Sequence, residues 1–160
     1  MENCVYHGMD IHNYRARMGY MLKTLDRSGI PEEDKELIKK YVKSLLSTNM
    51  SFGRVAKYIA GLKVIREHMN CNFADAGRAE IEGLMGWLNS TDYTPHTKMD
   101  YRGVVKRFYR WLRTGAVDNS QPFPPEVVWI KEGMKRNEMK EPDVLTEDEA
   151  MAMINAAVKM

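Results

Sequence analysis

A row of basic side chains between residues 94 and 115 is the first feature of this sequence that could do chemistry. Its members recur every three or four residues: Arg102, Lys106, Arg110 and Arg113. At about 100° per residue, this spacing places them on one side of a helix, opposite an apolar side. Like charges four residues apart destabilise an isolated helix, and phosphate groups would relieve the repulsion. The spacing therefore predicts contact with a polyanion; the alternative is a solvated face that only keeps the chain soluble.

The start of the same helix carries polar side chains that could bind an anion. His96, Thr97 and Lys98 follow Thr94 and Pro95, which are typical of a helix cap and a first helical position. Backbone N–H groups at a helix N-terminus favour negative charge, so these side chains could hydrogen-bond phosphates there. The alternative is that Thr94 and Thr97 only cap the helix.

A second basic group lies on a helix that we expect to begin near residue 51. Arg54, Lys57 and Tyr58 fall together beside its apolar stripe. Gly61 lies on the same side, where the absence of a side chain allows either a neighbouring helix or a phosphate to come close. The remaining basic candidates are Lys135 and Arg136.

No set of residues indicates catalysis or a bound metal or cofactor. His12 and Arg15 form an H-x-x-R pattern, but it precedes the basic helices and we treat it as chance. His7 and His12 have no third metal ligand nearby and are not four residues apart. Glycine-rich phosphate-binding motifs are missing, and no serine or cysteine has an identifiable base. We therefore expect no catalytic residue, metal, cofactor or small-molecule substrate.

Composition limits the class of protein. The chain has 160 residues, 44% of them hydrophobic and 29% charged, which suffices for one ordinary core. Its formal net charge is only +2, so the case for a polyanionic partner depends on where the charges lie. Two separated cysteines, Cys4 and Cys71, argue against a disulfide framework. No apolar run approaches the roughly 20 residues that a membrane span requires, and we expect a soluble, cytoplasmic protein.

Helical periodicity dominates, and no run of alternating apolar and polar residues predicts a strand. The expected fold is all-α, a compact bundle of four to five helices. Apolar stripes and helix-end signals place these helices at about residues 14–25, 31–46, 51–69, 75–88 and 94–115, with Pro31 at the first position of the second and Asp75 as the cap of the fourth.

The predicted domain organisation has three parts. Residues 1–115 form the helical domain. Residues 116–144, which are rich in proline, form an interdomain linker with a short helix near 126–134. Residues 145–160 begin a further helix, because Thr146 and Glu149 have the spacing of a capping box. We expect that helix to be the start of another domain that the chain does not contain.

The sequence resembles the core-binding, SAM-like domain of tyrosine recombinases (phage integrases), especially the archaeal type. The most specific stretch is TPHTKMDY, running on to KRFYRWL, at residues 94–112. KELI at residues 35–38 and SFGRVAKYI at residues 51–59 resemble the second and third helices, and residues 81–88 resemble the fourth. PEVVWIK at residues 125–131 and LTEDEA at residues 145–150 resemble the linker and the first catalytic-domain helix.

The resemblance implies one half of a C-shaped clamp around double-stranded DNA. In that family a second domain supplies an arginine-rich cluster and a tyrosine nucleophile for DNA integration and recombination, and none of those residues matches a position here. The chain is accordingly expected to bind duplex DNA without cutting it, and the full-length protein to meet further recombinase protomers on DNA. Arg54, Lys57 and Arg102 are the candidates for guanine contacts. Two alternatives remain, a helical protein-interaction module and a non-catalytic DNA-binding accessory protein.

Overall fold

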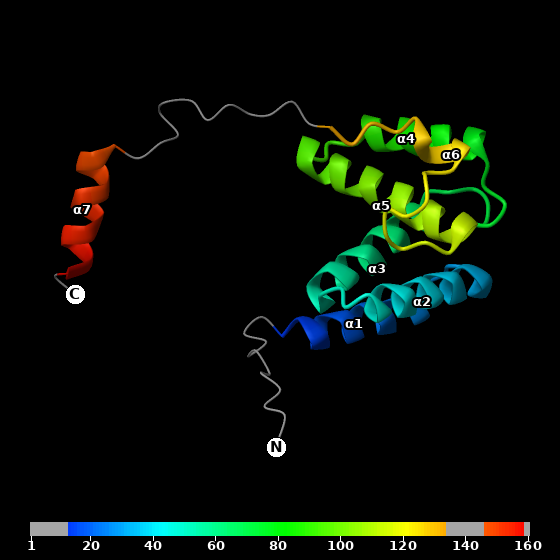
Figure 1. Ribbon diagram of the computed structural model, residues 1–160, viewed down its shortest axis with the longest axis horizontal. Helices are drawn as coiled ribbons and strands as arrows, with labels where there is room; N and C mark the ends of the chain where they lie inside the picture. Colours follow the sequence, from blue (N-terminus) through cyan, green and yellow to red (C-terminus); the bar gives the residue numbers. More distant parts are fainter. Residues whose placement is uncertain (1–12, 134–145, 159–160) are drawn as a thin grey trace, which may run out of the picture.

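The structure is a computed structural model that describes residues 13–133 and 146–158. Within these residues all regular secondary structure is helical (Figure 1), which confirms the all-α prediction. The helices are α1 (Tyr14–Asp26), α2 (Glu32–Ser47), α3 (Phe52–Glu67), α4 (Arg78–Ser90), α5 (Pro95–Thr114), α6 (Pro125–Val128) and α7 (Glu147–Val158). Helix α3 packs on α1, α2 and α5, and α5 also contacts α4 and α6. The five expected helices are all present.

Helix α5 is the longest and begins and ends where its sequence signals predict. The Thr97 N–H donates to Thr94 Oγ1 at 3.2 Å, and Pro95 occupies the first turn. Gly115 ends the helix with φ of 75°, a left-handed conformation that glycine adopts without steric cost. These ends fix which residues of α5 face the rest of the bundle.

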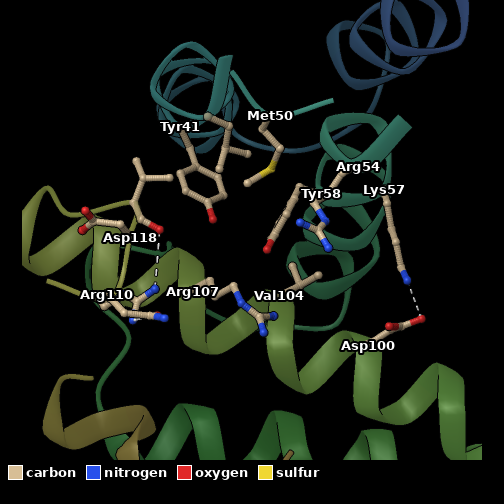
Figure 2. A pocket seen from close by; sticks show the side chains of 13 residues that line it. Tyr41, Met50, Arg54, Lys57, Tyr58, Asp100, Val104, Arg107, Arg110 and Asp118 are labelled. Carbon is tan, nitrogen blue, oxygen red and sulfur yellow. Dashed lines mark hydrogen bonds and ion pairs between the residues drawn. The ribbon is translucent and has the colours of Figure 1, made fainter. Parts of the chain in front are cut away.

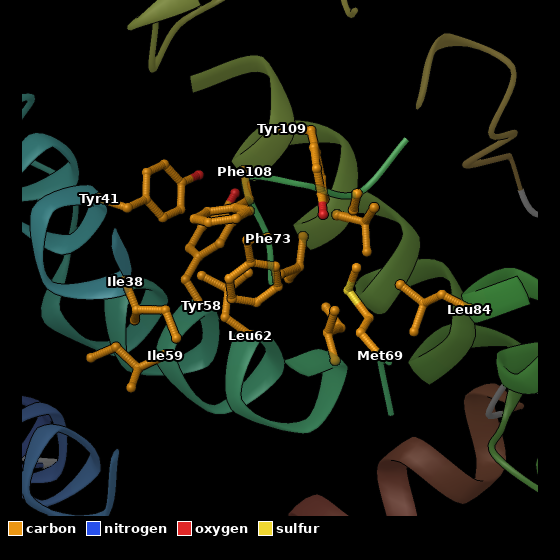
Figure 3. Packing of buried hydrophobic residues seen from close by; sticks show 14 of the residues in the cluster. Ile38, Tyr41, Tyr58, Ile59, Leu62, Met69, Phe73, Leu84, Phe108 and Tyr109 are labelled. Atoms are coloured by element: carbon orange, nitrogen blue, oxygen red, sulfur yellow. The ribbon is translucent and has the colours of Figure 1, made fainter. Parts of the chain in front are cut away.

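Aromatic rings fill the core between α2, α3 and α5 (Figure 3). Phe108 is fully buried, with its ring centroid 5.4 Å from that of Tyr41 and 4.7 Å from that of Phe73. A Cβ placed on Gly61 would lie 3.3 Å from a methyl of Val104, so the absence of a side chain at Gly61 lets α3 pack closely on α5. Of the two roles considered for Gly61, helix packing is therefore the one that the structure shows.

A buried ion pair joins the start of α2 to the end of α3. Asp34 is completely buried and accepts hydrogen bonds from Arg66 Nε and from the backbone N–H of Phe73. The Arg66 guanidinium also donates to Met69 O at 2.9 Å and to Asn72 Oδ1 at 3.0 Å. Because each side-chain nitrogen of Arg66 and each carboxylate oxygen of Asp34 has a partner, the pair fixes the loop that leads towards α4.

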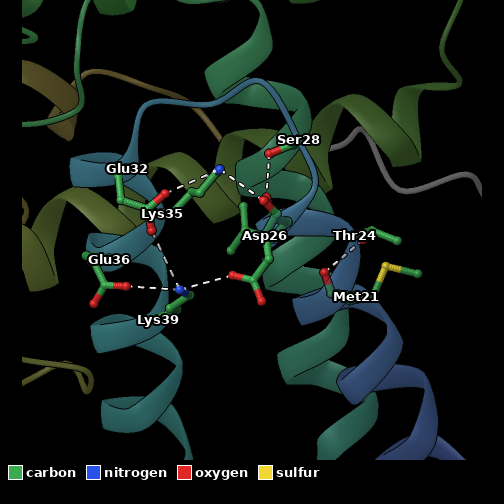
Figure 4. A network of polar contacts seen from close by, with 9 residues as sticks. Met21, Thr24, Asp26, Ser28, Glu32, Lys35, Glu36 and Lys39 are labelled. Atoms are coloured by element: carbon green, nitrogen blue, oxygen red, sulfur yellow. Dashed lines mark hydrogen bonds and ion pairs between the residues drawn. The ribbon is translucent and has the colours of Figure 1, made fainter.

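A second polar network closes the turn between α1 and α2 (Figure 4). Lys39 Nζ lies 2.9 Å from Glu36 Oε1 and 3.0 Å from Asp26 Oδ1. These two carboxylates, Glu36 first, raise the pKa of Lys39. Lys35 Nζ donates to the Asp26 carbonyl at 3.0 Å, so lysines of α2 close off the C-terminal end of α1.

Two details of the predicted helix ends are wrong. Helix α4 starts after Gly77 rather than at Asp75, because the Glu80 carboxylate accepts a hydrogen bond from the Gly77 N–H at 2.9 Å and so completes the first turn. The helix expected near 126–134 is only the short α6, and residue 134 lies outside the described residues.

The first part of the expected linker is packed against the bundle. Val127 and Ile130 are 0% and 4% exposed and belong to the same apolar core as α5. The density of prolines predicted a spacer, but apolar side chains between the prolines give this segment a face to bury. We call residues 117–132 the return segment, since they run back along α5. The packed bundle therefore extends beyond residue 115.

The capping box predicted at the start of α7 is present. The Thr146 N–H donates to Glu149 Oε2 at 2.9 Å, and the Glu149 N–H donates to Thr146 Oγ1 at 3.3 Å. The first of these bonds is the main reason that the pKa of Glu149 is lowered. Lys135 and Arg136 lie outside the described residues.

We expect Asp34→Ala to lower the free energy of unfolding by about 3–5 kcal/mol, because it leaves Arg66 without its buried partner. Urea denaturation followed by circular dichroism measures this change. The control is Glu82→Ala, which breaks the exposed pair with Arg78 and should cost less than about 1 kcal/mol. Equal effects of the two substitutions would contradict the role given to Asp34.

Candidate nucleic-acid interface

Half of the basic row on α5 is buried, whereas both interpretations of the row, contact with a polyanion and a solvated face, require exposed side chains. Lys106 is 8% exposed and Arg110 is 3% exposed. The return segment covers this side of α5 with Phe123, over whose ring both cations lie, at 4.3 Å for Lys106 and 4.6 Å for Arg110. Helix α5 was expected to bury only its apolar side, but part of its basic side is buried as well.

Carboxylates of the return segment balance two of the charges in the row. Lys106 Nζ lies 3.1 Å from Glu132 Oε1 and donates to Ile130 O at 3.0 Å. Arg113 Nε lies 2.7 Å from Glu126 Oε1. The idea that phosphates must relieve the repulsion along the row is therefore wrong for Lys106 and Arg113.

Arg113 also ties α5 to the loop before α4. Its terminal guanidinium nitrogens donate to Ala74 O at 3.1 Å and to Ala76 O at 3.0 Å. With its bond to Glu126, this guanidinium joins three parts of the chain. These contacts give Arg113 a structural role.

The polar residues in the first turns of α5 differ in what they contact. Lys98 Nζ donates to Asn89 O at 2.9 Å, and Arg102 donates to Asn89 Oδ1 at 2.8 Å, so both contact the end of α4. Thr97 shares a 2.9 Å hydrogen bond with the Thr94 hydroxyl, as expected for capping. His96 is exposed. The predicted row is thus not one continuous surface.

A cleft lies between α2, α3, α5 and the beginning of the return segment, and we call it the α3–α5 cleft (Figure 2). Its volume is about 420 Å³. Three residues of the predicted group on α3 line it, namely Arg54, Lys57 and Tyr58, and Arg110 joins them from α5. The lining is completed mainly by Tyr41, Asp100, Val104, Arg107 and residues 117–119. The cleft thus brings together three of the predicted basic residues, Arg54, Lys57 and Arg110.

Positive charge predominates in the α3–α5 cleft, where four cationic side chains stand against the carboxylates of Asp100 and Asp118. Lys57 Nζ lies 2.6 Å from Asp100 Oδ2 at the rim. Asp118 accepts hydrogen bonds from the hydroxyl and backbone N–H of Ser120 at 2.5 and 3.1 Å. These bonds are the main cause of the lowered pKa of Asp118. Both carboxylates therefore already have partners.

Sequence reasoning missed Arg107 and Tyr41. Arg107 is outside the predicted row, but Asp100, Val104 and Arg107 are spaced by four and three residues and so share one side of α5. Val104 on that side packs on Gly61, so the same side also faces α3. Tyr41 belongs to the apolar stripe of α2, and nothing in its spacing indicates that its hydroxyl reaches a cleft.

Comparisons of the chain with protein-family models, with curated proteins and with solved structures find no match. In residues 13–133 and 146–158, no helix combines the length and apolar character needed to cross a membrane. The same residues contain no cluster of three or more potential metal ligands from His, Cys, Asp and Glu.

We expect Lys106→Ala to lower the free energy of unfolding by about 2 kcal/mol, a value reduced from that of a fully buried pair because Glu132 keeps contact with water. Amide hydrogen exchange should quicken at Val127 and Ile130, whose backbone bonds lie in the return segment. Arg102→Ala is the control, because Arg102 contacts α4. Unchanged exchange in the Lys106 variant would mean that this lysine does not hold the return segment.

Proposed function

We propose that this chain binds double-stranded DNA, in the manner of the core-binding half of a tyrosine site-specific recombinase. The observation that carries the proposal is the α3–α5 cleft, where cations from two packed helices gather. Basic side chains that neutralise phosphates supply most of the affinity of such proteins for DNA. The proposal assigns no catalytic residue to the chain.

The accessibility of the cations around the α3–α5 cleft supports a phosphate-binding role. The side chains of Lys57 and Arg107 are 58% and 43% exposed, and Arg54 is also exposed. Their present partners, Asp100 and Glu132, form ion pairs that remain partly solvated. Partly solvated ion pairs contribute little to stability, so phosphates can compete for these cations at small cost.

The resemblance to tyrosine recombinases is the reason for proposing double-stranded DNA as the ligand. Residues 51–59 and 94–112, which carry the resemblance, supply most of the cationic lining of the α3–α5 cleft. Arg102 and Lys98 are partly exposed but lie on the side of α5 that meets α4, so they are not part of the proposed interface at the cleft. Lys106 and Arg113 are left out of the proposed interface because return-segment carboxylates hold them.

The competing hypothesis is a protein-interaction module, and one observation favours it. Helix α7 exposes apolar side chains, with Met151 at 52%, Met153 at 62% and Ile154 at 55%. Exposed apolar residues at helical spacing are typical of surfaces that contact another protein. The salt dependence of binding separates the two hypotheses, because only phosphate contacts release condensed counterions.

We expect the purified chain to bind a mixed-sequence duplex with an affinity that falls steeply as salt rises, measured by fluorescence anisotropy. Arg54→Gln and Lys57→Gln should each weaken binding to all sequences and reduce the salt slope by about one unit. The control is Arg27→Gln, which removes an exposed charge at the end of α1, away from the cleft lining. Absence of duplex binding at about 50 mM salt, where screening is weak, would reject the proposal.

A further inference from the structure

Arg110 is a buried cation that no carboxylate of residues 13–133 or 146–158 contacts. One terminal nitrogen donates to Asn119 Oδ1 at 2.9 Å, and the other lies 3.5 Å from Val117 O. The Nε–H has no hydrogen-bond partner, although the atom is buried. A buried donor left unsatisfied is destabilising. Arg110 is thus the buried member of the α5 row whose charge and hydrogen bonds the described residues do not complete.

The carboxylate nearest in sequence does not fill this role. Asp118 feels the charge of Arg110, which contributes to its lowered pKa, but its oxygens are engaged by Ser120. On α5 itself, Lys106 and Arg113 have Glu132 and Glu126 as partners. Among the described residues, Arg110 meets the Phe123 ring and two neutral oxygens but no carboxylate, which leaves its charge open to an added anion.

Two tyrosine hydroxyls add hydrogen-bond donors to the same cleft. Tyr41 and Tyr58 are 1% and 7% exposed, and their rings meet edge to face with centroids 5.7 Å apart. Figure 2 shows both hydroxyls directed into the α3–α5 cleft, towards the side of α5 that carries Arg107 and Arg110. Burial raises the pKa of Tyr41, so its hydroxyl stays protonated and can donate a hydrogen bond at neutral pH.

We propose that the α3–α5 cleft binds one phosphate group, with Arg110 as its buried counter-charge. Arg54 and Arg107 close over the group from α3 and α5, and the Tyr41 and Tyr58 hydroxyls donate to it. Donors that converge from three helices suit a tetrahedral anion, whose oxygens point in several directions, better than a planar carboxylate. A phosphodiester of the DNA backbone and a free phosphate share this chemistry; that the phosphate belongs to DNA rests on the proposed function.

The test follows the arginine Nε–H resonances of the ¹⁵N-labelled chain while inorganic phosphate is added. We expect a saturable shift of the Arg110 Nε–H signal, with smaller shifts at the amides of residues 117–119. Sodium chloride at equal ionic strength should leave Arg110 unchanged. If Arg110 does not respond to phosphate, or responds equally to chloride, the inference is wrong.

Two variants separate a built site from general charge attraction. Tyr58→Phe keeps the buried ring and removes only the hydroxyl, and we expect it to weaken phosphate binding about tenfold, the loss of one hydrogen bond to a charged group. Arg107→Gln should weaken binding at least as much, and Arg27→Gln should have no effect. Equal weakening by Arg107→Gln and Arg27→Gln, with no effect of Tyr58→Phe, would overturn the proposal, because it would indicate attraction by net charge alone.

The same signal, observed with a short duplex, identifies the source of the phosphate. A shift of Arg110 by the duplex, weakened by Tyr58→Phe, supports a backbone phosphate in the cleft. A shift by inorganic phosphate without duplex binding would leave the inference standing and reject the proposed function. Duplex binding without any response of Arg110 to either ligand would reject the inference and leave the proposed function standing.

Discussion

The packing of the return segment against the basic side of α5 is the interaction on which the rest of the structure depends. Apolar contacts through Val127 and Ile130 bring Glu126 and Glu132 to Arg113 and Lys106. Carboxylates delivered in this way neutralise charges that would otherwise repel one another along the helix. The return segment thereby buries part of the basic side of α5, and only the cations that it leaves uncovered can contact a partner.

The exposed cations of the proposed site, Arg54, Lys57 and Arg107, lie where α3 approaches α5. Gly61 lets the two helices come close at Val104, and Arg54 and Lys57 on α3 consequently lie across a narrow space from Arg107 on α5. Cations held at fixed separation on rigid helices lose little conformational freedom when they bind an anion. Arg110 lies where the buried face and the cleft meet, so it belongs both to the packing of the return segment and to the proposed binding site.

The far side of the bundle has a different function, which is to hold the cleft walls in place. The buried pair of Asp34 and Arg66 ties α2 to α3, so Tyr41 and Tyr58 stay in register across the two helices. Trp111 Nε1 donates to Ser44 Oγ at 3.1 Å and links α5 back to α2. The three helices that line the cleft, α2, α3 and α5, are therefore fixed to one another by contacts outside the cleft.

The sequence alone determined the all-helical class, the five main helices, both ends of α5 and the capping box at Thr146, because each follows from local periodicity or from residues within four positions. It also indicated Arg54, Lys57 and Tyr58 as one group. The partners of Lys106 and Arg113 lie 26 and 13 residues further along the chain, and no local pattern predicts such contacts. Burial of that side of α5, and the entry of Arg107 and Tyr41 into the cleft, were decided by tertiary packing, because a helix shows which side chains share a face but not what covers it.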